Sequence, residues 1–139
     1  MAYFWPELRT MKGIAVLWAS MVMACLVANA QTEIFNPMKD AIKGGDATTL
    51  VKYFAQAVDI NLEGNINTYS KAQSEFVLKD FFKKHPVNDF SIVHTGSSKG
   101  GLQFAIGRYL SGTAGYSVLM RVRQVGEDNL VHEISFVKE

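Results

Sequence analysis

The feature that most constrains the fold is a run of four segments near the C-terminus in which apolar and polar residues alternate. The segments are joined by short connections rich in glycine, and they cover residues 90–95, 102–110, 116–125 and 130–137. Alternation with a period of two puts successive side chains on opposite faces of a strand, so each segment has one apolar face. Short glycine-rich connections join neighbouring strands that run in opposite directions. The pattern therefore predicts an antiparallel meander with one buried face.

The residues before the meander predict two helices and a hairpin. Apolar residues recur at four-residue spacing over residues 33–43. Asp46 is placed to begin a second helix, whose apolar stripe is Leu50, Val51 and Phe54, with Ala57 as a further candidate. Residues 58–62 then alternate as a strand, and residues 66–69 return as a second strand after a turn that contains glycine.

A third helix is predicted between this hairpin and the meander. Ser70 and Gln73 form a capping box at its start, Phe76 belongs to its predicted apolar face, and Pro86 ends it. The complete order is α-α-β-β-α-β-β-β-β. We therefore predict an α+β fold in which helices pack on a strongly curved antiparallel sheet in one cone-like domain.

A stretch near the N-terminus has the pattern of an export signal. Lys12 follows Met11, an uncharged apolar run covers residues 13–27, and the next three residues, Ala-Asn-Ala, match the small-x-small pattern of a cleavage site. The run is shorter than the roughly 20 residues that a membrane-spanning helix needs. We therefore expect residues 1–30 to be a cleaved signal peptide, with Met11 a better-placed start than the first residue, and no stable membrane span afterwards.

Residues 31–139 are then one domain, expected in the periplasm or outside the cell. The formal net charge of the chain is +1, whereas a dedicated nucleic-acid binder carries a strong basic excess. The single cysteine, Cys25, excludes an internal disulfide and a cysteine-rich zinc site. Cys25 stands in an imperfect lipoprotein cleavage box and is followed by the apolar Leu26, so we expect it to be removed with the signal peptide rather than lipidated.

Several segments of this domain resemble a known family. They are residues 35–46, Val58 to Leu62, Tyr69 to Gln73 leading into Phe81-Phe82, and the ending His132 to Phe136. They are similar to a family of small secreted bacterial proteins, domain of unknown function 4783. The order of elements resembles the nuclear-transport-factor-2-like, or cystatin-like, superfamily, which includes ketosteroid isomerases and polyketide cyclases. The resemblance implies a bent sheet that wraps a long helix and leaves a cone-shaped cavity, but a fold does not imply a function.

Candidate site residues follow from the predicted strand faces. If the apolar rows of the four strands face the helices, the cavity is lined by His94, Arg108, Tyr116 and His132. A neutral histidine, a fixed cation and a phenol in an apolar cavity suit the binding of an acidic ligand or the transfer of a proton. A bulge at Gly107 would slip the register by one residue and turn Arg108 outward.

No catalytic or metal-binding pattern accompanies these residues. A ketosteroid-isomerase-type site needs a buried carboxylate base, and the predicted inner rows contain no Asp or Glu. Two histidines fall short of the three or four ligands of a zinc site, so neither a metal nor a cofactor is expected. Arg121 and Arg123 share the opposite face of their strand and, with Lys99, suit an anionic partner. The alternatives are a solvated outer sheet face without a partner and a homodimer through that face.

These observations favour an exported, non-catalytic binding module that holds a small ligand or a partner protein in or beside the cone. The alternative is a small isomerase-, hydratase- or cyclase-like enzyme in which His94 or His132 acts as the base and Arg108 or Tyr116 polarises the substrate. That alternative requires at least two of the four groups to converge on one substrate atom within about 3 Å.

Overall fold

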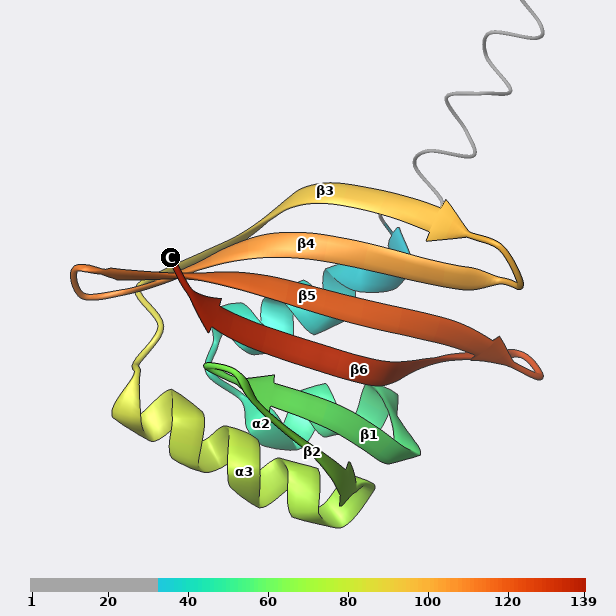
Figure 1. Cartoon of the computed structure of the whole chain (residues 1–139), viewed down its shortest axis with the longest axis horizontal. Helices are drawn as coiled ribbons and strands as arrows, with labels where there is room; N and C mark the ends of the chain where they lie inside the picture. Colours follow the sequence, from blue (N-terminus) through green and yellow to red (C-terminus); the bar gives the residue numbers. More distant parts are fainter. Residues whose placement is uncertain (1–32) are drawn as a thin grey trace, which may run out of the picture. The chain divides into compact units, whose positions relative to one another are not determined.

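The computed structural model describes residues 33–139, so the predicted signal peptide and Cys25 lie outside the described residues. The described part begins with a helix over residues 33–43. The elements that follow are α2 (Ala47–Leu50), the 3-10 helix η1 (Val51–Tyr53), β1 (Phe54–Leu62), β2 (Asn65–Ser70), α3 (Lys71–Lys84), β3 (Asp89–Ser98), β4 (Leu102–Ser111), β5 (Ala114–Val125) and β6 (Asp128–Lys138). The predicted order of helices, hairpin, helix and four strands is confirmed (Figure 1).

The second helix is much shorter than the sequence pattern indicates. Asp46 caps it as predicted, because its side chain accepts a hydrogen bond from the backbone N–H of Thr49 at 3.0 Å. The helix ends at Leu50, however, and the backbone is extended from Phe54 onward. The prediction that Phe54 belongs to this helix is therefore wrong. Phe54 packs into the core as the first residue of β1, and a short apolar stretch of this kind fits the helical and the extended period equally well.

Helix α3 begins with the predicted capping box. The backbone N–H of Gln73 donates to the Ser70 hydroxyl at 3.2 Å, and the backbone N–H of Ser70 donates to the Gln73 side chain at 3.1 Å. Its buried face carries Ser74, Leu78, Phe81 and Phe82. The prediction that Phe76 belongs to this face is wrong, since Phe76 is 71% exposed. Among residues 33–139 there is no helix with the length and apolar character needed to cross a membrane.

The six strands form one sheet in the order β2-β1-β6-β5-β4-β3. Figure 1 shows β3 to β6 side by side as bent ribbons, with β1 and β2 continuing the sheet beside α3. The predicted meander of β3 to β6 is antiparallel throughout. The sheet as a whole is mixed rather than antiparallel, because β6 pairs in parallel with β1 and thereby joins the hairpin to the meander.

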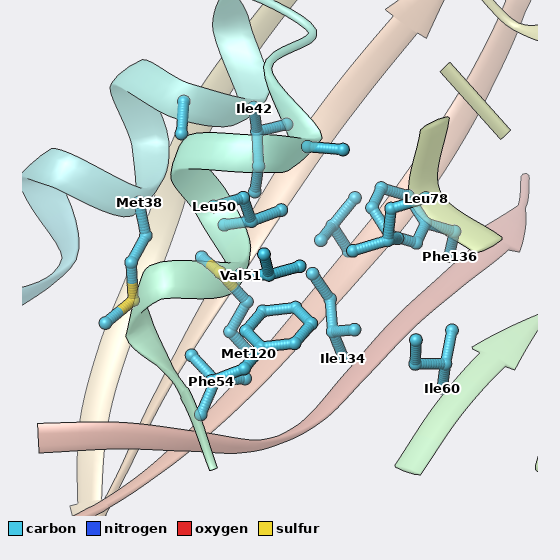
Figure 2. Packing of buried hydrophobic residues seen from close by; sticks show 14 of the residues in the cluster. Met38, Ile42, Leu50, Val51, Phe54, Ile60, Leu78, Met120, Ile134 and Phe136 are labelled. Atoms are coloured by element: carbon cyan, nitrogen blue, oxygen red, sulfur yellow. The ribbon is translucent and has the colours of Figure 1, made fainter. Parts of the chain in front are cut away.

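The core lies between the helices and one face of this sheet. Figure 2 shows how apolar side chains from the first helix, the α2–η1 segment, α3 and the strands meet there. The largest fully buried members include Met38, Ile42, Leu50, Ile60, Leu78, Met120 and Phe136, each at most 1% exposed. We call the strand residues that face this core the inner rows, and those on the opposite side the outer face.

Candidate functional site

Aromatic side chains fill the space between α3 and the inner rows. The ring of Phe81 lies 4.5 Å from that of Phe136 and 5.8 Å from that of Tyr109, measured between centroids. Tyr109 lies 5.9 Å from Tyr116. All four residues are at most 4% exposed. The part of the cone next to α3 is therefore packed with protein side chains.

Tyr116 lies in the inner row of β5, where the sequence placed it. Its hydroxyl is hydrogen-bonded to Nδ1 of His85 at 3.1 Å. Burial, and after it the charge of Glu63, raise the pKa of the Tyr116 phenol above its usual value of 10.0. The phenol is therefore neutral near pH 7 and is already bonded to a group of the protein.

Arg108 does not lie in the inner rows, so its predicted place in the cavity is wrong. It pairs across the sheet with Ser117 on the outer face, and its Nε atom lies 3.5 Å from a carboxylate oxygen of Glu139. The inner position next to it is Gly107. A Cβ atom there would lie 2.6 Å from two ring atoms of Phe90, so the glycine gives the buried ring its space. The β4 register therefore follows this close packing and leaves Arg108 outside.

His94 also lies on the outer face, against the prediction. The β3–β4 register shifts between Ile92, which pairs with Gly107 of the inner row, and His94, which pairs with Ile106 of the outer face. This β-bulge moves every later residue of β3 to the opposite face. His94 is exposed, and its ring lies 5.8 Å from that of Phe104.

His132 occupies a second register break. The β5–β6 pairing goes from Val122↔Val131 directly to Arg121↔Glu133, so His132 is the extra residue of a bulge. It is half-buried, and its Nε2 atom is buried without a hydrogen-bond partner among the described residues.

The four predicted residues do not converge. Tyr116 pairs with Lys138, which is six residues along β6 from His132, or about 20 Å at the usual rise of a strand. Arg108 and His94 lie on the opposite face of the sheet from Tyr116. The geometry that the isomerase-like alternative required is therefore absent from these four residues.

The outer face of β4 and β5 carries a hollow of about 370 Å³. Its apolar lining comes from Leu102, Phe104, Ile106 and Leu119, all half-buried, and Ser98 and Arg121 also line it. Ile106 and Leu119 are direct cross-strand neighbours, as are Phe104 and Arg121. The volume falls in the range of ordinary small-ligand sites. We call this feature the outer hollow.

Phe104 packs directly on the backbone of Gly96 in β3. A Cβ atom at Gly96 would lie 2.5 Å from the nearest atom of the Phe104 ring. The missing side chain on β3 is thus the reason that this large aromatic residue can lie against the sheet. The position of one wall of the outer hollow depends on a glycine in the neighbouring strand.

Arg121 lines the outer hollow, and Arg123 and Lys99 are close in the chain or across the sheet to its lining residues. Arg121 and Arg123 are both exposed on the outer face, as the sequence predicted, and Arg123 pairs with Leu102 across the sheet. Arg121 lies 3.3 Å from Glu133, whereas Arg123 and Lys99 have no ion pair among residues 33–139. The hollow therefore combines an apolar lining with one paired arginine, and two cations without ion pairs among residues 33–139 belong to the segments next to it. No group of three or more His, Cys, Asp or Glu side chains able to hold a metal ion occurs in the described part of the chain.

His85, which no sequence pattern marks as a site residue, lies in a polar cluster at the end of α3. Its ring bonds Tyr116, its carbonyl accepts a hydrogen bond from the Tyr109 hydroxyl, and it lines a second hollow of about 200 Å³. In the sequence, a histidine immediately before Pro86 indicates only the end of a helix, because a positively charged side chain there interacts favourably with the helix dipole. No local pattern indicates that two tyrosines from distant strands meet it.

Comparison with known proteins agrees with this fold. A family model described as domain of unknown function (DUF4783) matches residues 35–136. A crystal structure of a DUF4783 family protein from Bacteroides uniformis is 25% identical, with a TM-score of 0.70, covering 74% of this chain and 94% of that one. A cystatin-fold protein from Novosphingobium aromaticivorans is 17% identical, with a TM-score of 0.59 over 77% of this chain and 97% of that one. An NTF2-like protein of unknown function from Shewanella baltica is 13% identical, with a TM-score of 0.63 over 83% and 95%. No curated protein matches significantly.

Proposed function

Because this chain belongs to the DUF4783 family, whose name assigns no activity, we propose its function from the geometry: it is an exported, non-catalytic binding module whose ligand site is the outer hollow. The occupant we propose is a small amphipathic anion. Its apolar part fills the hollow and its anionic group lies beside Arg121 and Arg123. The ligand is thus held beside the cone and not in it.

The observation that carries this proposal is that helices cover one face of the sheet, while apolar side chains on the other face remain partly exposed. The inner rows are packed against helices, whereas four large apolar residues of β4 and β5 remain half-buried around the hollow. Burial of their remaining apolar surface is favourable by about 25 cal/mol per Å². A ligand that covers this surface supplies the burial that no described residue supplies.

The charges on the outer face select an anion. Arg123 and Lys99 lack ion pairs among the described residues, and the guanidinium of Arg121 is more than half exposed despite its pair with Glu133. An exposed arginine at the edge of an apolar site binds carboxylate or sulfonate oxygens through two parallel N–H donors. The apolar lining then contributes affinity and the arginines contribute orientation.

Export is supported by the sequence of residues 11–30, with its positive start, apolar run and small-residue cleavage pattern. A chain released from such a signal would act in the periplasm or outside the cell. We propose neither a membrane span for the released chain nor a nucleic acid as its partner.

A fluorescent amphipathic anion tests the site directly. We would titrate the protein with 8-anilinonaphthalene-1-sulfonate, which has apolar rings and one sulfonate, and record its fluorescence. We expect saturable binding that Leu119→Asp and Arg123→Glu each weaken about tenfold or more, or about 1.4 kcal/mol. Phe76→Asp is the matched control, because Phe76 is the most exposed of the large apolar residues and lies on α3. Equal binding by Leu119→Asp, or loss of binding only in Phe76→Asp, would reject the proposal.

A second copy of the chain is the alternative occupant of the outer face. Arg121 and Arg123 of one copy would then face carboxylates of the other, and Leu119→Asp would break the contact. Sedimentation velocity decides between the two. A dimer that Leu119→Asp converts into a monomer would replace the small-ligand proposal with an interface between copies.

A further inference from the structure

A small polar hollow lies between the β1–β2 turn and the last turn of α3, at a place separate from the outer hollow. Its volume is about 200 Å³. The hairpin contributes Leu62, Glu63 and Asn65, while α3 and its cap contribute Phe81, Lys84 and His85 together with Asp80. We call this feature the helix-end pocket. It offers two apolar surfaces and several polar groups within one small space.

Two backbone contacts and two ring contacts position His85 at the end of α3. Its backbone N–H donates to the carbonyl of Phe81 at 2.8 Å, and its own carbonyl accepts a hydrogen bond from the hydroxyl of Tyr109. Its Nδ1 atom bonds the hydroxyl of Tyr116 at 3.1 Å, and its ring lies 4.9 Å from that of Phe81. These contacts leave Nε2 on the side of the ring away from Tyr116, and no protein group within residues 33–139 bonds it. In the tautomer with its proton on Nδ1, Nε2 is therefore an acceptor held in one orientation.

Glu63 is the acidic residue of this pocket whose negative charge is not balanced by an ion pair. Asp80 is neutralised by Lys84, whose Nζ lies 2.9 Å from its carboxylate, whereas Glu63 has no ion pair among the described residues. The backbone of Glu63 is held in the left-handed region, at φ 54°, followed by Gly64 at φ 96°. Its N–H donates to the carbonyl of Phe136 at 2.9 Å, which ties the turn to β6. This turn places Glu63 next to Tyr116, whose phenol interacts with the Glu63 carboxylate, and the carboxylate still lacks a cation among the described residues.

A hydrogen-bond donor with positive charge can bond both the carboxylate of Glu63 and the Nε2 atom of His85. The Glu63 carboxylate and the Nε2 lone pair are acceptors, and the C-terminal end of α3 adds partial negative charge on the same side. A primary ammonium has three N–H donors in a compact cation, and a short alkyl stem can lie on Leu62 and Phe81. We propose that the helix-end pocket binds a primary alkylammonium group, with Glu63 as its counter-ion and His85 as a second acceptor.

Nuclear magnetic resonance of the protein tests this site. The probe is n-butylammonium chloride, and the reporters are the amides of Glu63 to Asn65 and the ring of His85. We expect saturable shifts that Glu63→Gln weakens about tenfold and His85→Gln weakens several-fold. Glu127→Gln, which removes an exposed carboxylate from the β5–β6 turn, is the matched control and leaves the binding unchanged. Thermal unfolding of each variant checks that it is folded.

Two further probes make the outcome decisive. Tetramethylammonium has the same charge and no N–H donor, so it should not saturate the reporters. An N-acetylated lysine methylamide distinguishes a lysine side chain of a protein from a free amine, and the tighter of the two primary ammonium probes identifies the source. Equal binding of tetramethylammonium, unchanged binding in Glu63→Gln, or saturable binding of inorganic phosphate at the same reporters would each overturn the proposal.

Discussion

Replacement of Gly107 by alanine tests the packing that determines which face of β4 is buried. A Cβ atom at this position would lie 2.6 Å from two ring atoms of Phe90 and 2.9 Å from the backbone oxygen of Ser91. Phe90 is only 1% exposed, so its ring has no open space into which it can turn. The oxygen belongs to the paired strand and can move only if β3 moves with it. The substitution therefore strains the β3–β4 pairing next to the bulge.

The expected loss is about 2 kcal/mol of unfolding free energy. Overfilling a well-packed core typically costs about 1–3 kcal/mol, and contact with both a buried ring and a backbone atom places Gly107→Ala in the upper half of that range. Removing a glycine from a strand returns about 0.5–1 kcal/mol, because the unfolded chain loses freedom. For a domain of this size, about 2 kcal/mol corresponds to a fall of roughly 8–10 °C in Tm.

Urea denaturation followed by circular dichroism measures this loss, with Gly96→Ala as the comparison. At Gly96 the new methyl meets only the half-buried ring of Phe104, which can turn toward solvent, so we expect a loss below about 1 kcal/mol. A cost below about 0.5 kcal/mol for Gly107→Ala would show that the contact with Phe90 does not determine the β4 register. A larger cost for Gly96→Ala than for Gly107→Ala would lead to the same conclusion.

Two other predictions concern the aromatic cluster. Burial, and after it the neighbouring Tyr116, raise the pKa of Tyr109 to about 12, so the folded state keeps this proton to higher pH than the unfolded chain does. The contribution of this proton to the free energy of unfolding is therefore fully present below about pH 10 and is lost as the pH rises through about 12, by at most about 2.7 kcal/mol. In urea titrations at several pH values, Tyr109→Phe should show a smaller loss of stability at high pH than the unchanged protein. Phe81→Ala should cost about 3–5 kcal/mol, whereas Phe76→Ala on the exposed side of the same helix should stay within about 0.5 kcal/mol; similar losses in thermal unfolding would contradict the assigned faces.

Features that depend on a few adjacent residues were predictable from the sequence. The capping box needs only Ser70 and Gln73 at a fixed spacing, and the structure shows both of its hydrogen bonds. The meander needs only alternation and glycine-rich connections, and β3 to β6 form it. The inner row of β5 was also predicted correctly, because its other face carries arginines and its apolar side is therefore unambiguous.

The candidate cavity was not predictable in the same way, because β4 is apolar on both faces. Its outer side carries Phe104 and Ile106, which are bulkier than the buried Ala105, so alternation alone favours the wrong side. The side that is buried depends on the close approach of Phe90 to Gly107, a contact between strands. The bulges at Val93, just before His94, and at His132 make the faces of β3 and β6 equally hard to predict, since one extra residue exchanges the faces of every residue beyond it.

The position of β6 has a consequence for how the chain reaches this structure. Ile60 of β1 pairs with Ile134, 74 positions later, and β6 alone connects the β1–β2 hairpin to β5. During synthesis the hairpin and the first three strands of the meander can form early, but each remains an incomplete sheet with an open edge until β6 has been synthesised. We therefore expect folding to be slow for a chain of this length. A stop codon before residue 128 should leave the β1–β2 hairpin and β3 to β5 as two unjoined parts of the sheet, whose exposed edges are prone to aggregate.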